Sequence, residues 1–580
     1  MCGIVGYIGA RQAAKIVTEG LKRLEYRGYD SFGVATMNTK VTIAKKSGRI
    51  SDENLNYTDL LGSVGIGHTR WATHGVPNDR NAHPHADCTG RIAVVHNGII
   101  ENYAELRRDL IGRGHTFTSD TDTEVIAHLV EEHYSGDLCS AVAETLPLLE
   151  GSYAILVIAE GEQRIIAARK ASPLVIGVGD REFICASDVT PLIDHTRRVI
   201  YLEDGDCADV TRAECLITQY GGPVKRPIEE VDWDIQDARK GGFPHYMLKE
   251  IFEQPQVFYN TLHSVREAPD AFSLLSKPGM ISIVACGSSF HAGLLYKYLF
   301  ESYCGMPVRV EIGSEFKYYT PPLSGPVIGI TQSGETADTL AALKMAKACG
   351  CPTIAVTNVV GSSVTRIADA TIYTRAGPEM SVAATKSFMA QLAAGVQIID
   401  CLLNHSLENE LERLNFRIEE ALMVPVDDAV ILCKDAKSIF YIGRGLFYPV
   451  ALEGALKMKE ISYIHAEGYA AGELKHGPFA LLSPDTPVVA IATPGRTYPV
   501  MISNIKEIKA RGAPVIGIGV IGDTQLPELV DIFIALPKSG EVTAIATVSV
   551  ILQRLAYLTA DTLGCDIDKP RNLAKSVTVE

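Results

Sequence analysis

The second half of the chain repeats itself, and this repeat limits the fold more than any other feature of the sequence. Four strand-like segments recur there in the same order and at similar spacing. The matched pairs are ISIVACGSS (281–289) with SIFYIGRG (438–445), PVIGITQSGE (326–335) with PVVAIATPG (487–495), KMAKACGCPTIAVTN (344–358) with KEIKARGAPVIGIGV (506–520), and ADATIYTRAGPE (368–379) with LVDIFIALPKSGE (529–541). Continuous Val/Ile runs that end in Gly/Ser turns are typical of parallel strands covered by helices on both faces. We therefore predict two copies of one α/β domain with a parallel sheet.

The first 235 residues have a different pattern, with many short apolar runs such as GIVGYIG and YAILVIA and few helical stretches. This pattern predicts an α+β domain with stacked sheets, in which 13–24 and 123–133 are helices. A polar, Gly- and Pro-containing segment around 234–255 indicates a linker. The predicted boundaries are 1–235 for the first domain, 236–275 for the linker and lead-in helices, 276–410 and 430–565 for the two α/β domains, and 566–580 for a C-terminal tail.

Composition excludes several kinds of partner and compartment. The formal charge is −15, which disfavours nucleic acid and anionic membranes. The longest apolar runs are shorter than the roughly 18 residues that a membrane span needs, and the N-terminus does not resemble a signal peptide. The 13 cysteines are an odd number scattered along the chain, which indicates reduced thiols and a cytoplasmic protein.

Cys2 directly follows the initiator methionine. Removal of Met1 would give this cysteine a free α-amine of pKa about 8 beside a thiol of pKa about 8.5, which is a nucleophile with its own base. A cysteine at this position is most often incidental. Here, however, an ordered series of polar motifs follows it. The series is LEYRGYDSFG (24–33), HTRWATHG (68–75), NAHPH (81–85), HNGIIEN (96–102) and SDTDTE (119–124).

These motifs resemble those of the class II glutamine amidotransferases, which are N-terminal-nucleophile enzymes whose stacked antiparallel sheets lie between helices. The resemblance implies that Cys2 attacks the glutamine amide to form a thioester, and that Asn97 and Gly98 form the oxyanion hole. It also implies that Arg70 binds the α-carboxylate of glutamine, that Asp122 binds its α-ammonium, and that Trp71 gates a path for ammonia. The remaining implied residues are Thr73, His74 and His83 in the glutamine pocket and Arg27 and Tyr29 in a gating loop.

Two of these motifs have other readings. The two histidines of His83-Pro84-His85 suggest a metal site. However, no cysteine or carboxylate lies at ligand spacing from them in the sequence, so we expect no metal. Asn97-Gly98 is also the strongest hairpin-turn dipeptide, a reading that is compatible with an oxyanion donor.

In the second half, TQSGET (331–336) and CGSS (286–289) each follow an apolar strand and precede a helical run. Backbone N–H groups and the helix dipole at such a turn favour an anion such as phosphate. The alternative is that these Ser and Thr residues only cap the helices.

For the segment 451–478 we predict a helix, then a loop and then a short helix. Glu453, Lys457 and Glu460 share one helical face. The surrounding Ala, Leu, Met and Ile predict that this face is partly buried, whereas the alternative is an ion-paired face in solvent. From Pro570 onward the tail carries one lysine, Lys575, and we expect the tail to fold back into a site.

These motifs resemble sugar isomerase domains. The resemblance implies that Glu460 moves a proton between sugar C1 and C2, that Lys457 assists, and that Lys575 forms a Schiff base with fructose. It implies that His476 opens the sugar ring, reaching the site of a neighbouring subunit. The implied sugar-phosphate-binding residues are Ser288, Ser289, Thr331, Gln332, Ser333, Thr336, Val382 and Ala574.

Together the two resemblances imply an enzyme that converts fructose 6-phosphate and glutamine into glucosamine 6-phosphate and glutamate, the first step of hexosamine synthesis. Ammonia released at Cys2 would be channelled to the sugar site. The expected partners are the two small substrates and a second copy of the chain, with no cofactor, nucleic acid or membrane. Two alternatives remain at this point: another class II glutamine amidotransferase, or a non-catalytic sugar-phosphate-binding regulator.

Overall fold

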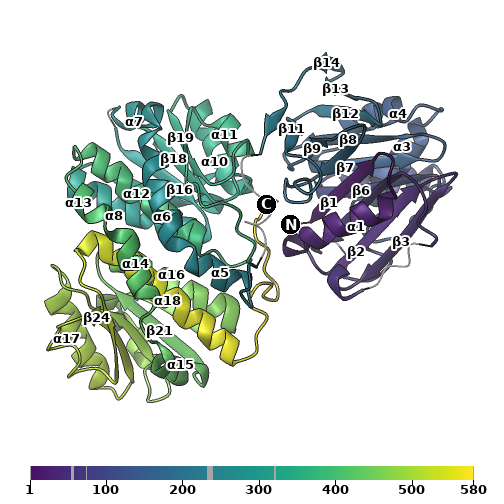
Figure 1. Cartoon of the computed structure of the whole chain (residues 1–580). Helices are drawn as coiled ribbons and strands as arrows, with labels where there is room; N and C mark the ends of the chain where they lie inside the picture. The colour runs from purple at the N-terminus through teal and green to yellow at the C-terminus, as the bar shows by residue number, and fades with distance from the viewer. Residues whose placement is uncertain are drawn as a thin grey trace. The chain divides into compact units, whose positions relative to one another are not determined.

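The computed structural model describes residues 2–53, 58–72, 75–231, 240–277, 279–318 and 322–578. Its contacts divide the chain into two compact units, each with hydrophobic cores of its own (Figure 1). The N-terminal unit is Met1–Ala238 together with Ala574–Glu580, and the C-terminal unit is Arg239–Leu573.

The N-terminal unit contains two antiparallel sheets. From edge to edge, the first is β15 (Glu229–Glu230), β11 (Arg198–Tyr201), β9 (Val175–Val178), β10 (Phe183–Ala186), β1 (Gly3–Ile8), β4 (Val64–Arg70), β2 (Ser31–Met37) and β3 (Val41–Ser47). The second is β14 (Gly222–Val224), β13 (Cys215–Gln219), β12 (Asp206–Thr211), β8 (Arg164–Lys170), β7 (Gly151–Ala159), β6 (Ile92–Ile100) and β5 (His85–Ala86).

Alternation along the strands builds a four-layer sandwich from these sheets. In β1, Ile4 and Ile8 point into a core shared with the second sheet, whereas Val5 and Tyr7 pack under helix α1 (Ala13–Arg23). The outer face of the second sheet packs under α3 (Glu124–His133) and α4 (Leu138–Thr145). The predicted α+β domain with stacked antiparallel sheets between helices is therefore confirmed, as are both predicted helices.

The C-terminal unit contains two parallel sheets of identical strand order. The first sheet is β17 (Val308–Ile312), β16 (Ile281–Ala285), β18 (Val327–Thr331), β19 (Thr353–Thr357) and β20 (Ala370–Tyr373). The second is β22 (His465–Ala470), β21 (Ser438–Gly443), β23 (Val488–Ile491), β24 (Val515–Val520) and β25 (Ile532–Leu536). Each of the four matched segment pairs falls on equivalent strands, so the predicted pair of α/β domains is confirmed.

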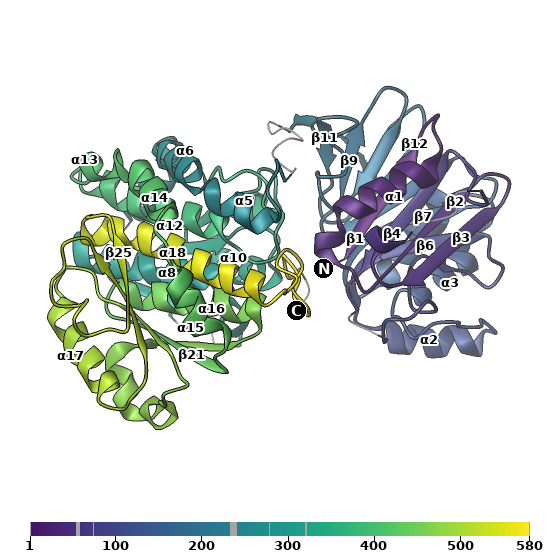
Figure 2. The same cartoon turned by 60° about the horizontal axis from the view of Figure 1, so that its bottom comes forward.

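The two sheets share one core, which includes Ile283 and Ile330 of the first sheet with Tyr441 and Ile518 of the second. Helices pack around and between the sheets (Figure 2). The main ones are α5 (Tyr246–Phe252), α6 (Gln254–Arg266), α7 (Pro269–Leu275), α8 (Gly287–Leu299), α10 (Ala337–Ala348), α12 (Lys386–Leu402), α14 (Leu414–Leu422), α15 (Asp427–Lys434), α16 (Phe447–Ser462), α17 (Tyr498–Lys509) and α18 (Glu541–Thr562).

Within the described residues, α18 is the one helix long and apolar enough to cross a membrane. However, 89% of its apolar window is buried inside the protein. Tyr557, for example, is 2% exposed and belongs to the shared core. This burial is typical of a core helix.

The predicted pattern of helix, loop and short helix over 451–478 is wrong in its middle part. After α16 the chain forms β22, an edge strand that pairs in parallel with β21, and then the short helix η5 (Ala471–His476). The sequence HAEGYA has few branched apolar residues, so its strand character depends on pairing with β21 and was not readable locally.

Candidate functional site

Cys2 lies at the start of β1, where the sheet register brings it beside the end of β4. Gly3 is opposite Thr69 in the β1–β4 pair. The Trp71 N–H donates to Cys2 Sγ at 3.2 Å, and Sγ lies 3.4 Å from the Trp71 carbonyl oxygen. Burial raises the pKa of the Cys2 thiol, while the Trp71 N–H and the charge of Arg70 act in the opposite direction. The thiol is thus held at a fixed place between two strands.

Asn97 reaches the same place from the second sheet. Its Nδ2 donates to the Cys2 carbonyl oxygen at 2.9 Å, and the residue is 5% exposed. The imidazole of His68 lies behind it, with Nε2 3.1 Å from Asn97 Oδ1 and 3.0 Å from the His96 carbonyl oxygen. Burial lowers the pKa of His68 to about 3, with Arg70 and His96 adding to the shift, so its ring is neutral near pH 7. His68 therefore donates from Nε2 and fixes the amide of Asn97 with its N–H groups toward Cys2.

Gly98 occupies a position that only glycine tolerates. Its φ is +133°, and a Cβ would lie 2.0 Å from the Ser152 carbonyl oxygen. Asn97 and Gly98 pair with Ala154 and Tyr153 in the middle of the β6–β7 ladder. The hairpin-turn reading of Asn97-Gly98 is therefore wrong, because sheet pairing overrides the local turn preference.

Arg70 and Asp122 add opposite charges to this site. Arg70 is 3% exposed and donates from Nη2 to the Gly75 carbonyl oxygen at 3.1 Å. Asp122 is 5% exposed, and its Oδ2 accepts from the Ile100 N–H at 2.9 Å. Burial lowers the pKa of Arg70, whereas the nearby Cys2 and Asp122 oppose that shift. Cys2, Arg70 and Asp122 thus lie within electrostatic range of one another, as a site for an α-amino acid requires.

Other predicted glutamine-site residues surround this arrangement. His83 is buried and stacks on His68 with ring centroids 4.1 Å apart. The Trp71 ring packs edge-on against Tyr29 at 5.6 Å. Arg27 is 4% exposed and donates to the Ser187 carbonyl oxygen at 2.7 Å, which anchors the segment before Tyr29. The predicted residues Thr73 and His74 lie outside the described residues.

The C-terminal unit contains a buried ion cluster between α8 and α16. Lys457 is 0% exposed, and its Nζ lies 3.3 Å from Glu453 Oε1 and 2.5 Å from Glu460 Oε2. Burial alone lowers the pKa of Lys457, but the two carboxylates outweigh it and raise that pKa above its usual value. The predicted partly buried helix face is confirmed, and Lys457 is a permanent cation between two carboxylates.

Helix α8 contributes two polar partners to this cluster. Ser288 Oγ donates to Glu453 Oε1 at 2.9 Å and accepts from Lys457 Nζ at 3.2 Å. His291 Nδ1 lies 2.8 Å from Glu453 Oε2. Burial raises the pKa of Glu453, but Lys457 and His291 outweigh burial and lower it. Both carboxylate oxygens of Glu453 are thus paired, whereas the side chain of Glu460 is 19% exposed.

The TQSGET turn (331–336) joins β18 to α10 and brings several hydroxyl groups close together. We call this turn the cradle. Thr331 Oγ1 and Thr336 Oγ1 are 2.9 Å apart, and Thr331 Oγ1 also accepts from the Gly334 N–H at 3.2 Å. Ser333 Oγ accepts from the Glu335 N–H at 3.1 Å. Neither α8 nor α10 has a side-chain hydrogen bond from its N-cap residue, which counts against the capping alternative.

Gly334 shapes this cradle. Its φ is +69°, and a Cβ would lie 2.0 Å from Ser362 Oγ. Gln332 is half-buried in the same turn, and its carbonyl oxygen accepts from the Asn358 N–H at 3.2 Å. On α8, Ser289 Oγ accepts from Gln391 Nε2 at 2.9 Å.

Four further predicted sugar-site residues are Val382, Ala574, Lys575 and His476. Val382 is buried, and its N–H donates to the Asp568 carbonyl oxygen at 3.0 Å. Ala574 and Lys575 belong to the stretch that groups with the N-terminal unit. His476 is exposed at the end of η5. Their roles stay predictions.

Sequence reasoning missed two positioning residues, His68 and His291. His68 stands inside HTRWATHG and His291 follows CGSS by two residues, but their partners lie 29 and 162 residues away. Local patterns carry no signal for such contacts.

Comparison with known proteins agrees with the division of the chain into an N-terminal and a C-terminal unit. A glutamine amidotransferase domain family matches residues 68–194, and the SIS domain family matches residues 274–400 and 432–560. The glutamine--fructose-6-phosphate aminotransferase [isomerizing] of Pyrococcus horikoshii is 50% identical over 600 residues, covering all of both chains. That of Thermus thermophilus is 46% identical over 604 residues, again covering all of both chains.

A solved structure covers the second half. The C-terminal domain of glucosamine-fructose-6-phosphate aminotransferase from Francisella tularensis matches with a TM-score of 0.54 and 37% identity, covering 57% of this chain and 99% of that one. With relatives that match from end to end and domain families that match both units, the chain belongs to the glutamine--fructose-6-phosphate aminotransferase (isomerizing) family.

Proposed function

We propose that this protein is an enzyme that converts fructose 6-phosphate and glutamine into glucosamine 6-phosphate and glutamate. The observation that supports it best is the amide of Asn97, which is oriented by His68 and donates to the carbonyl oxygen of Cys2, because this gives the residue whose thiol would carry out acyl transfer an oriented N–H donor. Neither a sugar-phosphate regulator nor a simple isomerase has a use for that pair.

In the first half-reaction, Cys2 Sγ attacks the side-chain amide carbon of glutamine. The Cys2 α-amine, free after removal of Met1, accepts the thiol proton and passes it to the leaving ammonia. Asn97 Nδ2 and the Gly98 N–H stabilise the oxyanion. Water then cleaves the thioester and releases glutamate. Arg70 and Asp122 hold the α-carboxylate and α-ammonium of glutamine.

In the second half-reaction, ammonia passes to the C-terminal unit and replaces the C2 oxygen of open-chain fructose 6-phosphate, with loss of one water. Lys575 forms a Schiff base at C2 that ammonia displaces. Glu460 takes a proton from C1 and returns it to C2, which turns the ketose imine into the aldose amine. Lys457, a cation whose Nζ lies 2.5 Å from Glu460 Oε2, holds that carboxylate in place for the proton transfer.

The TQSGET cradle would hold the phosphate with hydroxyl groups and with the N-terminal end of α10. His476 would open the sugar ring in the site of a partner subunit, which agrees with its exposure and with a homodimer. We place the reaction in the cytoplasm because all 13 cysteines are free thiols, as a reducing compartment maintains them.

The experiment is to supply glutamine labelled with ¹⁵N in the side-chain amide together with fructose 6-phosphate, and to follow the label by mass spectrometry. We expect labelled glucosamine 6-phosphate from the wild-type chain. Cys2→Ala should give none from glutamine but should retain slow synthesis from added ammonia. Label that never enters an amino sugar, or glutaminase activity that persists in Cys2→Ala, would contradict the proposal.

A further inference from the structure

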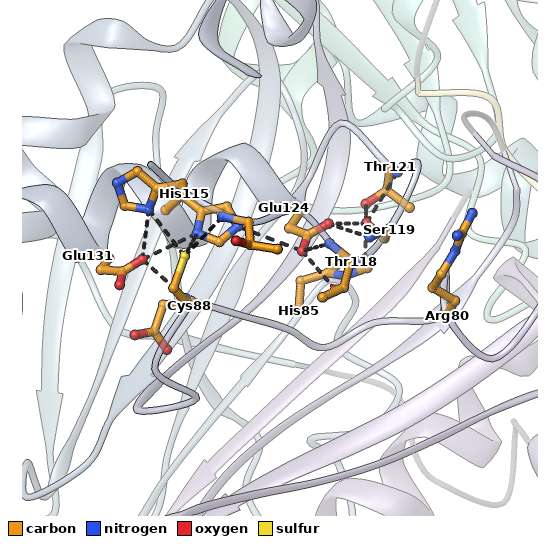
Figure 3. A network of polar contacts seen from close by, with 12 residues as sticks. Arg80, His85, Cys88, His115, Thr118, Ser119, Thr121, Glu124 and Glu131 are labelled. Atoms are coloured by element: carbon orange, nitrogen blue, oxygen red, sulfur yellow. Dashed lines mark hydrogen bonds and ion pairs between the residues drawn. The ribbon is translucent and has the colours of Figure 1, made fainter. Parts of the chain in front are cut away.

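A second cluster of reactive side chains lies in the N-terminal unit, and neither half-reaction uses it. Cys88 follows β5 and His115 follows α2 (Tyr103–Gly112) (Figure 3). His128 and Glu131 lie on α3. Each residue offers one ligand atom, and these four atoms all lie within 4.8 Å of one another. Cysteine, histidine and carboxylate are the ligands that Zn²⁺ takes in proteins.

The distances fit one tetrahedral ion. Cys88 Sγ lies 3.4 Å from Nδ1 of His115 and 3.4 Å from Nδ1 of His128. Glu131 Oε2 lies 3.0 Å from the first nitrogen and 3.3 Å from the second. Zn–S and Zn–N bonds of about 2.3 and 2.0 Å at tetrahedral angles separate their ligands by about 3.3 to 3.6 Å. Three of the four edges, at 3.3 to 3.4 Å, match this spacing, and the His115–Glu131 edge at 3.0 Å is shorter.

The surroundings of the cluster provide hydrogen-bond partners for two of its ligands. Both histidines point Nδ1 inward. His128 Nε2 lies 3.7 Å from Glu124 Oε1, too far for a hydrogen bond, whereas His115 Nε2 is 2.7 Å from Glu132 Oε1. Metal-bound histidines commonly donate their other ring N–H in this way. The Thr116 N–H donates to Cys88 Sγ at 3.3 Å, as suits a thiolate.

Exposure divides the cluster into a buried and an open side. The side chains of His128 and His115 are 1% and 8% exposed, whereas Cys88 is exposed. An ion can therefore enter from the Cys88 side and be held by side chains already fixed in the protein. Cys88 thiolate and Glu131 carboxylate would balance the two positive charges of Zn²⁺.

We propose that Cys88, His115, His128 and Glu131 bind one Zn²⁺ ion as a structural site. Four protein ligands fill the tetrahedron, which is the arrangement of structural rather than catalytic zinc. This metal site could not be predicted from the sequence, because its ligands are separated by 27, 13 and 3 positions and match no zinc motif.

The site would clamp the loop that carries Asp122. His115 precedes this loop and His128 follows it, so one ion ties both ends to Cys88. From the cluster a chain of contacts runs inward: Glu124 accepts from Ser119 Oγ at 2.6 Å, Ser119 Oγ is 3.0 Å from Thr121 Oγ1, and Thr121 Oγ1 is 3.1 Å from His85 Nε2 (Figure 3). The zinc would thus stabilise the glutamine pocket without touching the substrate, an effect on activity that rests on the proposed function.

Metal binding is tested on the full-length chain without any assay of activity. After purification and dialysis against metal-free buffer, mass spectrometry of the elements should find about one zinc per chain. After removal of zinc by a chelator, added Co²⁺ should give a thiolate-to-cobalt charge-transfer band and the intense visible bands of tetrahedral cobalt. Cys88→Ser should lose the charge-transfer band, and the control Cys349→Ser, which removes an exposed thiol of the C-terminal unit, should keep it.

A gentler variant separates metal binding from folding. Glu132→Gln keeps all four ligands but weakens the partner of His115, so zinc affinity should fall about 10- to 100-fold while the chain stays folded by circular dichroism. Chelation should lower the melting temperature of the wild type but not of Cys88→Ser. A folded wild-type chain that binds neither zinc nor cobalt at stoichiometric level would overturn the proposal, and the cluster would then be a hydrogen-bonded His–Glu network. A rise in KM for glutamine on chelation bears only on the clamp and not on the metal site.

Discussion

The Nε2 atom of His68 lies 3.1 Å from Oδ1 of Asn97, and this contact decides which end of the Asn97 amide faces Cys2. A reversed amide would present oxygen, not N–H, to the developing oxyanion. His68 is thus a positioning residue for glutamine hydrolysis.

His68→Ala should slow glutamine hydrolysis by roughly 10-fold or more, within the limit of about 10² to 10³ that loss of an oxyanion donor causes. KM for glutamine should change little, and ammonia-dependent synthesis should be unaffected. The decisive measurement is a double-mutant cycle with Asn97→Ala. If His68 acts through Asn97, the double variant should be no slower than Asn97→Ala alone, whereas additive losses would refute this role.

Gly334→Ala tests the phosphate cradle. The added Cβ meets Ser362 Oγ at 2.0 Å and the backbone has φ +69°, a conflict that costs about 1 to 3 kcal/mol. KM for fructose 6-phosphate should therefore rise roughly 5- to 100-fold, with glutamine hydrolysis unchanged. Gly350→Ala is the matched control, because φ there is +76° but nothing lies within 4 Å of the new Cβ. Equal KM values for the two variants would exclude the cradle from phosphate binding.

Glu460→Gln should slow synthesis by about 10²- to 10⁴-fold, the usual contribution of a general base, whether ammonia comes from glutamine or from solution. Glutamine hydrolysis should persist. Glu412→Gln changes an exposed carboxylate of the same unit and should have no effect on either rate. Synthesis at the wild-type rate in Glu460→Gln would remove this residue from the proton transfer.

Lys457→Met should destabilise the C-terminal unit by about 3 to 5 kcal/mol, because it leaves Glu453 buried without its cation. Adding Glu453→Gln to that variant should restore part of the loss. Urea unfolding measures both, with the transition of the C-terminal unit identified as the one that fructose 6-phosphate shifts. A loss below about 1 kcal/mol would show that the buried ion pair contributes little to stability.

Buried histidines should make the N-terminal unit sensitive to acid. Burial lowers the pKa of His68 to about 3 and that of His83 well below its usual value, whereas unfolded histidine titrates near 6.5. As the pH falls below about 6.5 the unfolded chain binds protons that the folded chain does not, so stability is complete above that pH and decreases by about 1.4 kcal/mol per pH unit for each such histidine. The free energy of unfolding, measured by urea unfolding between pH 7.5 and 5, should show this slope. A chelator is present in these measurements to exclude effects of metal. His83→Gln should make the slope shallower, and an unchanged slope would contradict the assignment.

Much of the fold could be predicted because it depends on local patterns in the sequence. Alternation in β1 separates Ile4 from Val5, and the repeated strand-and-turn segments place TQSGET between β18 and α10. The Glu453, Lys457 and Glu460 face followed from helical spacing alone.

What could not be predicted depends on contacts between distant segments. The orientation of Asn97 is set by His68, and Glu453 contacts His291 on another helix. The four residues of the proposed zinc site come from three separate segments. Asn97-Gly98 shows the reverse case, in which a strong local turn signal is overridden by pairing with β7.

The ion cluster of the C-terminal unit joins the two repeats at equivalent helices. Ser288 comes from α8, which follows β16, and Glu453 comes from α16, which follows the matching strand β21. If the cluster were formed by two separate copies of a single repeat, both helices would carry the same residues. Because both repeats lie in one chain, the two helices can carry different residues, and a fragment holding either repeat alone would lack part of this ion cluster as well as part of the shared core.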